Sequence, residues 1–159
     1  YPKGVELYAC ETIADLSVYG LGSANNGGGS DGQEVTLPGV SLSAGERLYV
    51  GAAPDGWYAV FGFTPDYSDG DMAVNGNDAI ELYRDGVLID VFGVVDQNGS
   101  GSVWEYTDGY AYRKSNTGPN AGAFNAANWS IAPQAFAELD EMGAKSVVGD
   151  VFGAYTCTP

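Results

Sequence analysis

A chain of 159 residues with 45% apolar side chains is long enough to bury one hydrophobic core, and it contains no run of the roughly 18 apolar residues that a membrane span needs. Its 21 acidic and 6 basic residues give a formal net charge of −15, which disfavours binding to nucleic-acid phosphates unless divalent cations bridge the two. Histidine is absent, which excludes Ser-His-Asp and Cys-His catalytic groups and histidine-bearing zinc sites.

Short apolar runs separated by glycine-rich turns follow one another along the chain. They predict strands at residues 5–9, 16–20, 34–37, 47–52, 79–83, 87–92, 110–114, 129–132 and 152–156. Residues 55–61 are compatible with a short helix or a turn, and residues 134–142 have an apolar spacing compatible with one or two helical turns. Because no long helical period interrupts the strands, the sequence predicts an all-β fold, an antiparallel β-sandwich with long loops, formed by a single domain over residues 1–159.

The hairpin at residues 79–92 is the strongest of these signals. Its strands meet at Asp85-Gly86, a dipeptide that readily adopts the positive φ angles of a tight turn. Apolar and polar residues alternate along it, which predicts one face in the core and one in water. Glu81 and Asp90 occupy polar positions. An acid–base pair is one interpretation of two such carboxylates, and a solvated face is the favoured one.

The two cysteines, Cys10 and Cys157, lie near opposite ends of the chain and belong to no CxxC motif. We expect them to form a disulfide that ties a C-terminal extension, residues 133–159, back to the domain. Such a bond implies an oxidising compartment, so we expect a secreted protein. The start at Tyr1, without an initiator Met, is expected of a processed product or of a piece of a larger protein.

Three loops are long enough to carry function: residues 22–33, 64–77 and 96–106. The stretch 64–78 places oxygen ligands at the close, irregular spacing that calcium loops favour: Asp66, Asp69, Asp71, Asn75 and Asp78. A second candidate calcium loop holds Asp96, Asn98 and Ser100, with Glu105 as the closing carboxylate. Acidic turn residues without a metal are the alternative at both places. Residues 22–33 are expected to be flexible or packed by their own side chains.

Aromatic residues gather after the hairpin. Trp104, Tyr106, Tyr110, Tyr112 and Arg113 are a candidate ligand platform, where rings stack on sugars or bases. Tyr110 and Tyr112 are two residues apart and face the same side of a strand, and burial in the core is the alternative for them. Arg113 faces the other side. We expect it to pair with Glu105 or Asp108, the alternative being recognition of a phosphate or carboxylate ligand.

Five pieces of the sequence occur in an order and spacing that resemble one family. They are KGVELY, then ADLSVYGLGSANNGGGSDGQEVTLPGVSLSAGERLYV, FGFTPDY, NGNDAIELYRDGVLIDVFG and WEYTDGYAYRKSNTGPNAGAFNAANW. Over residues 3–131 the chain resembles the lamin-tail domain family, in particular its bacterial modules attached to secreted nucleases and cell-surface proteins. The resemblance implies an immunoglobulin-like β-sandwich.

The expected function is a noncatalytic bacterial module, secreted as an accessory domain of a larger extracellular or cell-surface protein. We expect a monomer that binds a protein or glycan surface and has no certain cofactor. Two alternatives stay open: a calcium-dependent carbohydrate-binding module, and a DNA-handling accessory domain of a secreted nuclease. The second requires bridging divalent cations or a contact centred on Arg113 and Lys114.

Overall fold

A computed structural model describes residues 2–139, 141–149 and 151–158, and within these ranges it holds nine strands in three sheets. A three-stranded sheet has the order β1 (Gly4–Tyr8), β4 (Arg47–Gly51), β5 (Tyr67–Ser68). A four-stranded sheet has the order β3 (Val35–Thr36), β2 (Tyr19–Ala24), β6 (Ala79–Arg84), β7 (Val87–Phe92). The third sheet pairs β8 (Tyr110–Arg113) with β9 (Trp129–Ala132). All pairings are antiparallel except β4 with β5.

Helices are few and short. The described α-helices are α1 (Pro54–Phe61) and α2 (Glu141–Gly149), and four 3₁₀ turns span Leu16–Val18, Asn25–Gly27, Gly70–Met72 and Ala126–Asn128. Pro54 starts α1 at a position where its missing N–H is not needed, and Gly62 ends it with a left-handed φ of 76°. The fold is therefore mostly β-sheet, as predicted, and residues 55–61 form the expected helix.

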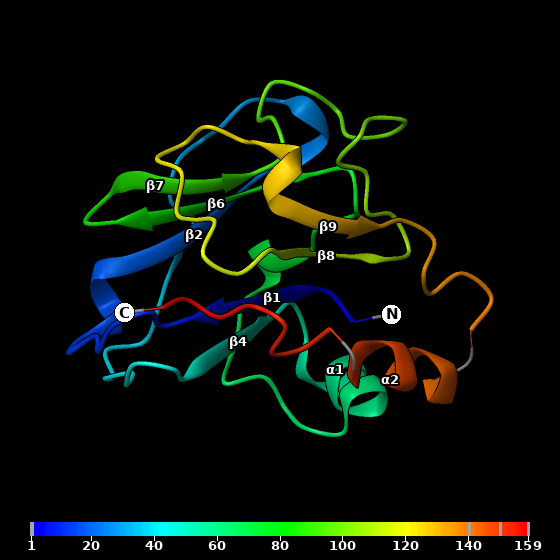
Figure 1. The fold of residues 1–159 in the computed structure, drawn as a ribbon, viewed down its shortest axis with the longest axis horizontal. Coiled ribbons are helices and arrows are strands. Elements are labelled where there is room, and N and C mark those ends of the chain that lie inside the picture. Colours follow the sequence, from blue (N-terminus) through cyan, green and yellow to red (C-terminus); the bar gives the residue numbers. More distant parts are fainter. Residues whose placement is uncertain (1, 140, 150, 159) are drawn as a thin grey trace.

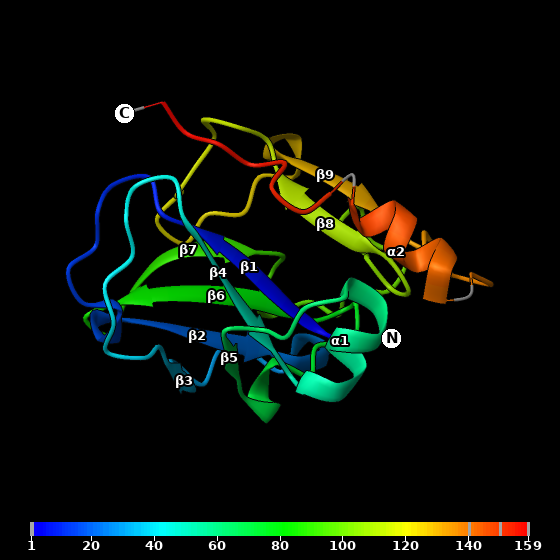
Figure 2. The same cartoon turned by 90° about the horizontal axis from the view of Figure 1, so that it is seen from below.

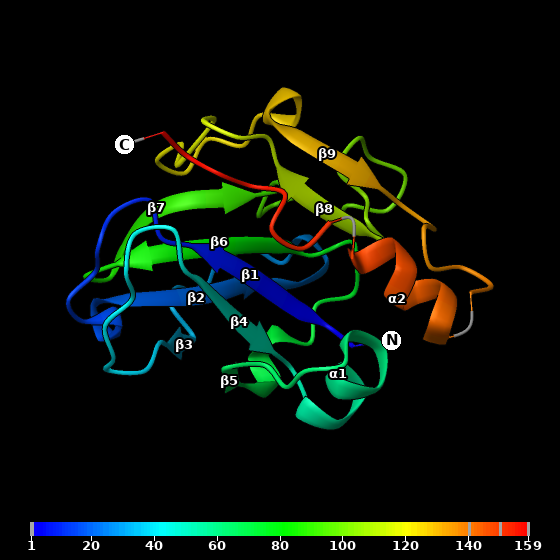
Figure 3. The same cartoon turned by 60° about the horizontal axis from the view of Figure 1, so that its bottom comes forward.

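The strands form two layers. In Figure 1 strands β2, β6 and β7 of the four-stranded sheet lie above β1 and β4. Figures 2 and 3 show β1 and β4 crossing this sheet obliquely, with β8 and β9 alongside at a similar tilt and α1 beside α2 at one end. A hydrophobic core lies between the layers and includes Leu21, Val35, Leu48, Val50 and Met72. This arrangement is an all-β sandwich; its immunoglobulin-like connectivity stays a prediction.

The turn of the central hairpin is as predicted, because Asp85 and Gly86 have φ angles of 51° and 72°. The prediction of a solvated face was wrong. Glu81 is 1% exposed, and it lies opposite Gly22 on β2. Loop 25–34 covers that face: the carbonyl of Gly32 approaches Gly22 so closely that a Cβ there would lie 2.5 Å from it. Both faces of β6 are thus covered, so the alternation of apolar and polar residues along this strand does not separate buried from exposed side chains.

Three predicted elements were misplaced. Residues 16–20 begin as a 3₁₀ turn because the Asp15 carboxylate accepts a hydrogen bond from the Ser17 amide, so the strand starts only at Tyr19. The helix expected at 134–142 is α2, farther along the chain, and residue 140 lies outside the described residues. Residues 152–156 form no strand.

The C-terminal segment is instead fixed by side chains and by a disulfide. Gly153 donates its amide to the Glu6 carboxylate, and the Arg47 guanidinium donates to the carbonyls of Gly153 and Tyr155. The disulfide between Cys10 and Cys157 is present as predicted, with 5.7 Å between the Cα atoms. The segment runs in red past β1 in Figure 3. Among the residues that the structure describes, no helix has the length and apolar character to cross a membrane.

Candidate functional site

The three long loops meet at one end of the four-stranded sheet, around the side chain of Asp78. This residue is fully buried, at 0% exposure. One carboxylate oxygen accepts the Asn26 amide and the other accepts the Asn75 amide, both at 2.8 Å. The backbone carbonyl of Asp78 accepts the Tyr106 hydroxyl at 3.1 Å. A single residue just before β6 therefore contacts all three loops.

Side-chain amides add a second connection between the same loops. Asn77 donates its Nδ2 to Oδ1 of Asn26 at 2.9 Å and to Oδ1 of Asn98 at 3.1 Å. Gly27 has a left-handed φ of 76°, and a Cβ there would lie 2.3 Å from the amide nitrogen of Asn98. Glycine is needed at this position because the two loops touch through their backbones.

An open groove of about 500 Å³ lies beside this loop cluster. Its lining comes from Val94, Gln97, Gly101, Ser102, Val103, Trp104, Phe124, Asn125 and Ala126. Val103 is 79% exposed and Val94 is 40% exposed, although both are apolar. Trp104, by contrast, is only 1% exposed, because its ring packs against Gly93 and Gly99, where an added Cβ would lie within 3 Å of it. The groove thus combines a fixed aromatic residue with exposed valines.

The predicted calcium ligands of loop 64–78 perform other tasks. Asp66 accepts the Tyr49 amide at 2.8 Å, so it joins β4 to the segment before β5. Asp69 accepts the Asp71 amide at 3.1 Å and caps a 3₁₀ turn. Asn75 and Asp78 belong to the loop connection described above. Over the described residues, no group of three or more His, Cys, Asp or Glu side chains is placed to hold a metal ion.

The second predicted calcium loop closes on itself through hydrogen bonds. Asn98 Oδ1 accepts the Ser100 amide at 2.9 Å, and the Glu105 carboxylate accepts the Gly101 amide at 2.7 Å. Asp96 is exposed and lies beside Gly29 of the neighbouring loop. The oxygens of this loop therefore stabilise a turn, which is the alternative that the sequence left open.

The predicted ligand platform is divided in the structure. Trp104 and Tyr106 pack edge-on against Phe92 at centroid distances of 6.2 Å and 5.3 Å, so they belong to the core. Burial, and secondarily the charge of Asp78, raises the pKa of Tyr106. Tyr110 and Tyr112 stack on each other at 6.3 Å on one side of β8, as their spacing predicted, and both are half-buried.

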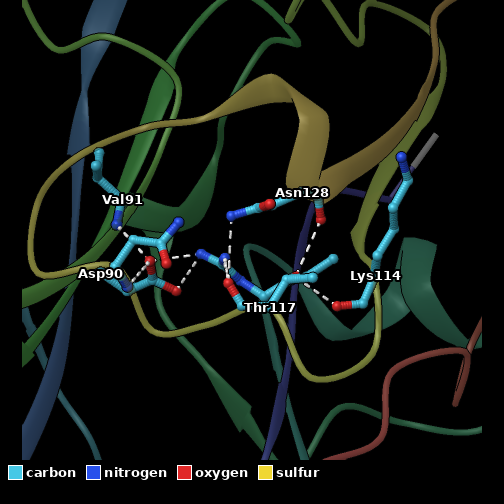
Figure 4. A network of polar contacts seen from close by, with 7 residues as sticks. Asp90, Val91, Lys114, Thr117 and Asn128 are labelled. Carbon is cyan, nitrogen blue, oxygen red and sulfur yellow. Dashed lines mark hydrogen bonds and ion pairs between the residues drawn. The ribbon is translucent and has the colours of Figure 1, made fainter.

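Arg113 belongs to a buried network that joins Asp90 of β7 to Thr117 in the loop after β8, two residues labelled in Figure 4. Its guanidinium contacts both oxygens of Asp90, and the two side chains are 9% and 16% exposed. It also donates to the Thr117 carbonyl at 3.0 Å and lies 4.4 Å from the ring centre of Trp129. The predicted partner, Glu105 or Asp108, was wrong. An ion pair was correctly expected, but the partner comes from the hairpin.

Lys114, next to Arg113 in sequence, points away from this network in Figure 4. Its Nζ donates to the Ala127 carbonyl at 2.9 Å. The adjacent basic pair of the sequence is therefore split: one member is buried against a carboxylate, and the other caps a neighbouring turn.

Glu81 anchors a polar cluster that sequence reasoning missed. Its two oxygens accept the Tyr83 hydroxyl at 3.0 Å and the Ser30 hydroxyl at 2.9 Å. Burial raises the pKa of Tyr83, the hydrogen bond with Ser30 lowers it in part, and the Glu81 carboxylate raises it further. Residues 22–24 of the predicted loop belong to β2, and the rest of loop 22–33 is packed through the side chain of Ser30, one of the two expectations for it. The sequence feature that could have indicated this cluster is Ser30, the hydroxyl-bearing residue that follows three glycines in this loop.

Comparisons of this chain with protein-family models, with curated proteins and with solved structures found no match. The resemblance to lamin-tail domains therefore rests on the sequence pieces quoted above.

Proposed function

We propose that this chain is a noncatalytic binding module of an extracellular or cell-surface protein, and that it binds a protein partner at the groove beside the loop cluster. The observation that carries the proposal is the exposure of Val103 and Val94 at a groove whose loop 96–106 is tied to the loop cluster by the Tyr106–Asp78 and Asn77–Asn98 hydrogen bonds. Exposed apolar side chains at the rim of a fixed groove are typical of interaction sites. The lack of histidine supports a noncatalytic role.

An extracellular setting is supported by the disulfide between Cys10 and Cys157, since such bonds persist in oxidising compartments. The resemblance to lamin-tail modules supports the same setting and a role as an accessory domain of a larger protein. The partner that fits is a protein surface that presents an apolar side chain next to basic groups. The net charge of −15 attracts basic groups, and Asp96 is exposed on a groove loop.

Nucleic acid is not favoured as the partner. Arg113 is paired with Asp90 and buried, and the amine of Lys114 is bound to a carbonyl. The buried Arg113 is therefore not free to neutralise phosphates, which is the main source of affinity for DNA, and the exposed Lys114 is set against a net charge of −15. Calcium-dependent sugar binding is likewise not favoured, because Trp104 and Tyr106 face the core.

A site-specific photo-crosslinker tests the proposal. The crosslinking residue replaces Val103 in one variant and Val87, an exposed valine on β7, in the matched control. Both proteins are irradiated in the extracellular fraction of the source organism. We expect one discrete adduct from the Val103 position, weakened by added salt and lost when Val94→Asp is introduced as well.

Equal labelling from both positions, or no adduct from Val103, would refute the groove as the binding site. Turnover of a nuclease or glycosidase substrate by the purified chain would refute the noncatalytic role.

A further inference from the structure

Lys3, the residue before β1, contacts a loop that is far away in sequence. Its Nζ donates to Oδ1 of Asn75 and to the carbonyl of Ala73 at 3.3 Å. Lys3 and Asn75 are 72 residues apart in the chain. Lys3 is half-buried and Asn75 is exposed. The fold thus brings a primary amine directly against a side-chain carboxamide.

The turn that presents this carboxamide is fixed on both sides. The Asn75 amide donates to the buried Asp78 carboxylate at 2.8 Å. The next residue, Gly76, accepts the Tyr106 amide through its carbonyl at 2.7 Å, and a Cβ on it would lie 2.3 Å from Cα of Thr107. The backbone at Asn75 is therefore held in place, and it has little freedom to carry the side chain away from Lys3.

We propose that Lys3 and Asn75 form an intramolecular isopeptide bond. After the ammonium group of Lys3 gives up a proton to water, its nitrogen attacks Cγ of Asn75, so that an Nζ–Cγ amide bond forms and the Cγ–Nδ2 bond breaks. The second proton that this nitrogen gives up leaves with Nδ2 as ammonia, and nothing is oxidised or reduced. Holding the two groups in contact replaces an encounter between separate molecules, which is a large part of the barrier to such a reaction.

A competing reaction of the same carboxamide is attack by the backbone nitrogen of Gly76, which forms a succinimide and also releases ammonia. The fold opposes it, because the five-membered ring requires the backbone at Asn75 to rotate while the hydrogen bonds on both sides hold it. Once it has lost its proton, a lysine amine is also a stronger nucleophile than a neutral peptide nitrogen. The contact with Lys3 is therefore the favoured route.

The consequence lies at the two ends of β1. Cys10, two residues after this strand, is already joined to Cys157. A bond from Lys3 to Asn75 would fix the other end of β1 to the loop before β6. The first strand would then be covalently held at both ends, which suits a module exposed to proteases or to mechanical load outside the cell. The inference does not depend on the groove or on its partner.

Intact mass of the full chain, measured unfolded and with its disulfide reduced, tests the proposal. We expect a mass lower than that of the sequence by one ammonia, and a proteolytic digest that contains a branched peptide joining Lys3 to Asn75. Lys3→Arg retains the charge and a hydrogen-bond donor but removes the amine, so it should restore the full mass, as should Asn75→Ala. Lys145→Arg is a matched control that should leave the ammonia loss unchanged.

Two results would overturn the proposal. One is the full sequence mass in the folded, purified chain. The other is an ammonia loss that persists in Lys3→Arg, which would assign the reaction to the succinimide. Tryptophan fluorescence confirms in each case that the variant is folded, so that a failure to fold is not mistaken for a failure to react.

Discussion

Replacing Asp78 by asparagine should destabilise the chain by about 2 to 3 kcal/mol. Asp78 is 0% exposed and accepts one backbone amide on each carboxylate oxygen. Hydrogen bonds to a charged group contribute about 1.5 to 3 kcal/mol each. Asparagine keeps one acceptor and places an N–H donor against the other amide, so one bond is lost and the second becomes neutral. The cost of burying a charge disappears at the same time, which offsets part of the loss.

Urea denaturation followed by tryptophan fluorescence measures this change, with Asp71→Asn as the matched control. Asp71 lies in the same loop but is exposed, and exposed substitutions of this kind change stability by roughly 0.5 kcal/mol or less. Hydrogen exchange adds a local readout. The amide protons of Asn26 and Asn75 should lose protection in Asp78→Asn before those of the β-sheet do.

The reasoning is refuted if Asp78→Asn unfolds at the same urea concentration as the wild type and both amides stay protected. That result would mean that other contacts position the loops. The rigidity of the groove beside them would then need a different explanation.

Three further predictions concern other parts of the fold. Cys10→Ser combined with Cys157→Ser should lower the free energy of unfolding by up to about 5 kcal/mol, since the disulfide closes a loop with a sequence separation of 147. Chemical denaturation of this variant and of the disulfide-bonded wild type measures the difference. Arg113→Lys should lower the free energy of unfolding by about 3 kcal/mol or more, because it leaves the buried Asp90 carboxylate poorly paired and removes the bond to the Thr117 carbonyl. Arg84→Lys, at the exposed ion pair with Asp85, is the control and should change stability little. Equal unfolding midpoints for the two variants would contradict this prediction. The raised pKa of Tyr106 means that its contribution to stability is complete below about pH 10, where the unfolded tyrosine is still protonated, and is lost as the pH rises further. Tyr106→Phe should therefore make the alkaline loss of stability shallower, and a slope unchanged from the wild type in urea titrations at rising pH would rule this out.

Much of the fold depends on local interactions that can be recognised in the sequence. The hairpin turn at Asp85-Gly86, the helix that starts at Pro54, and the strands around residues 47–51 and 110–113 depend on dihedral preference and apolar alternation within a few residues. One prediction failed where a side chain competed with the backbone. At residues 16–18, the carboxylate of Asp15 turned an expected strand into a 3₁₀ turn.

The candidate site could be predicted only in its parts. The sequence identified the three long loops as the places for function, and the structure gathers them at one end of the sheet. Asp78 was expected as one carboxylate among several metal ligands. Its actual role, accepting amides from two loops, depends on Asn26, which lies 52 residues away. No local pattern encodes that separation.

Composition, cysteine spacing and alternation, which are properties of the chain alone, determined an acidic, disulfide-bonded, all-β protein without histidine. Only the tertiary structure decided which polar residues are buried. Glu81 and Asp90 stand at polar positions of a hairpin, but loop 25–34 covers the first and Arg113 reaches the second. The reason is physical: alternation tells which residues share a face, whereas burial depends on what distant segments place over that face.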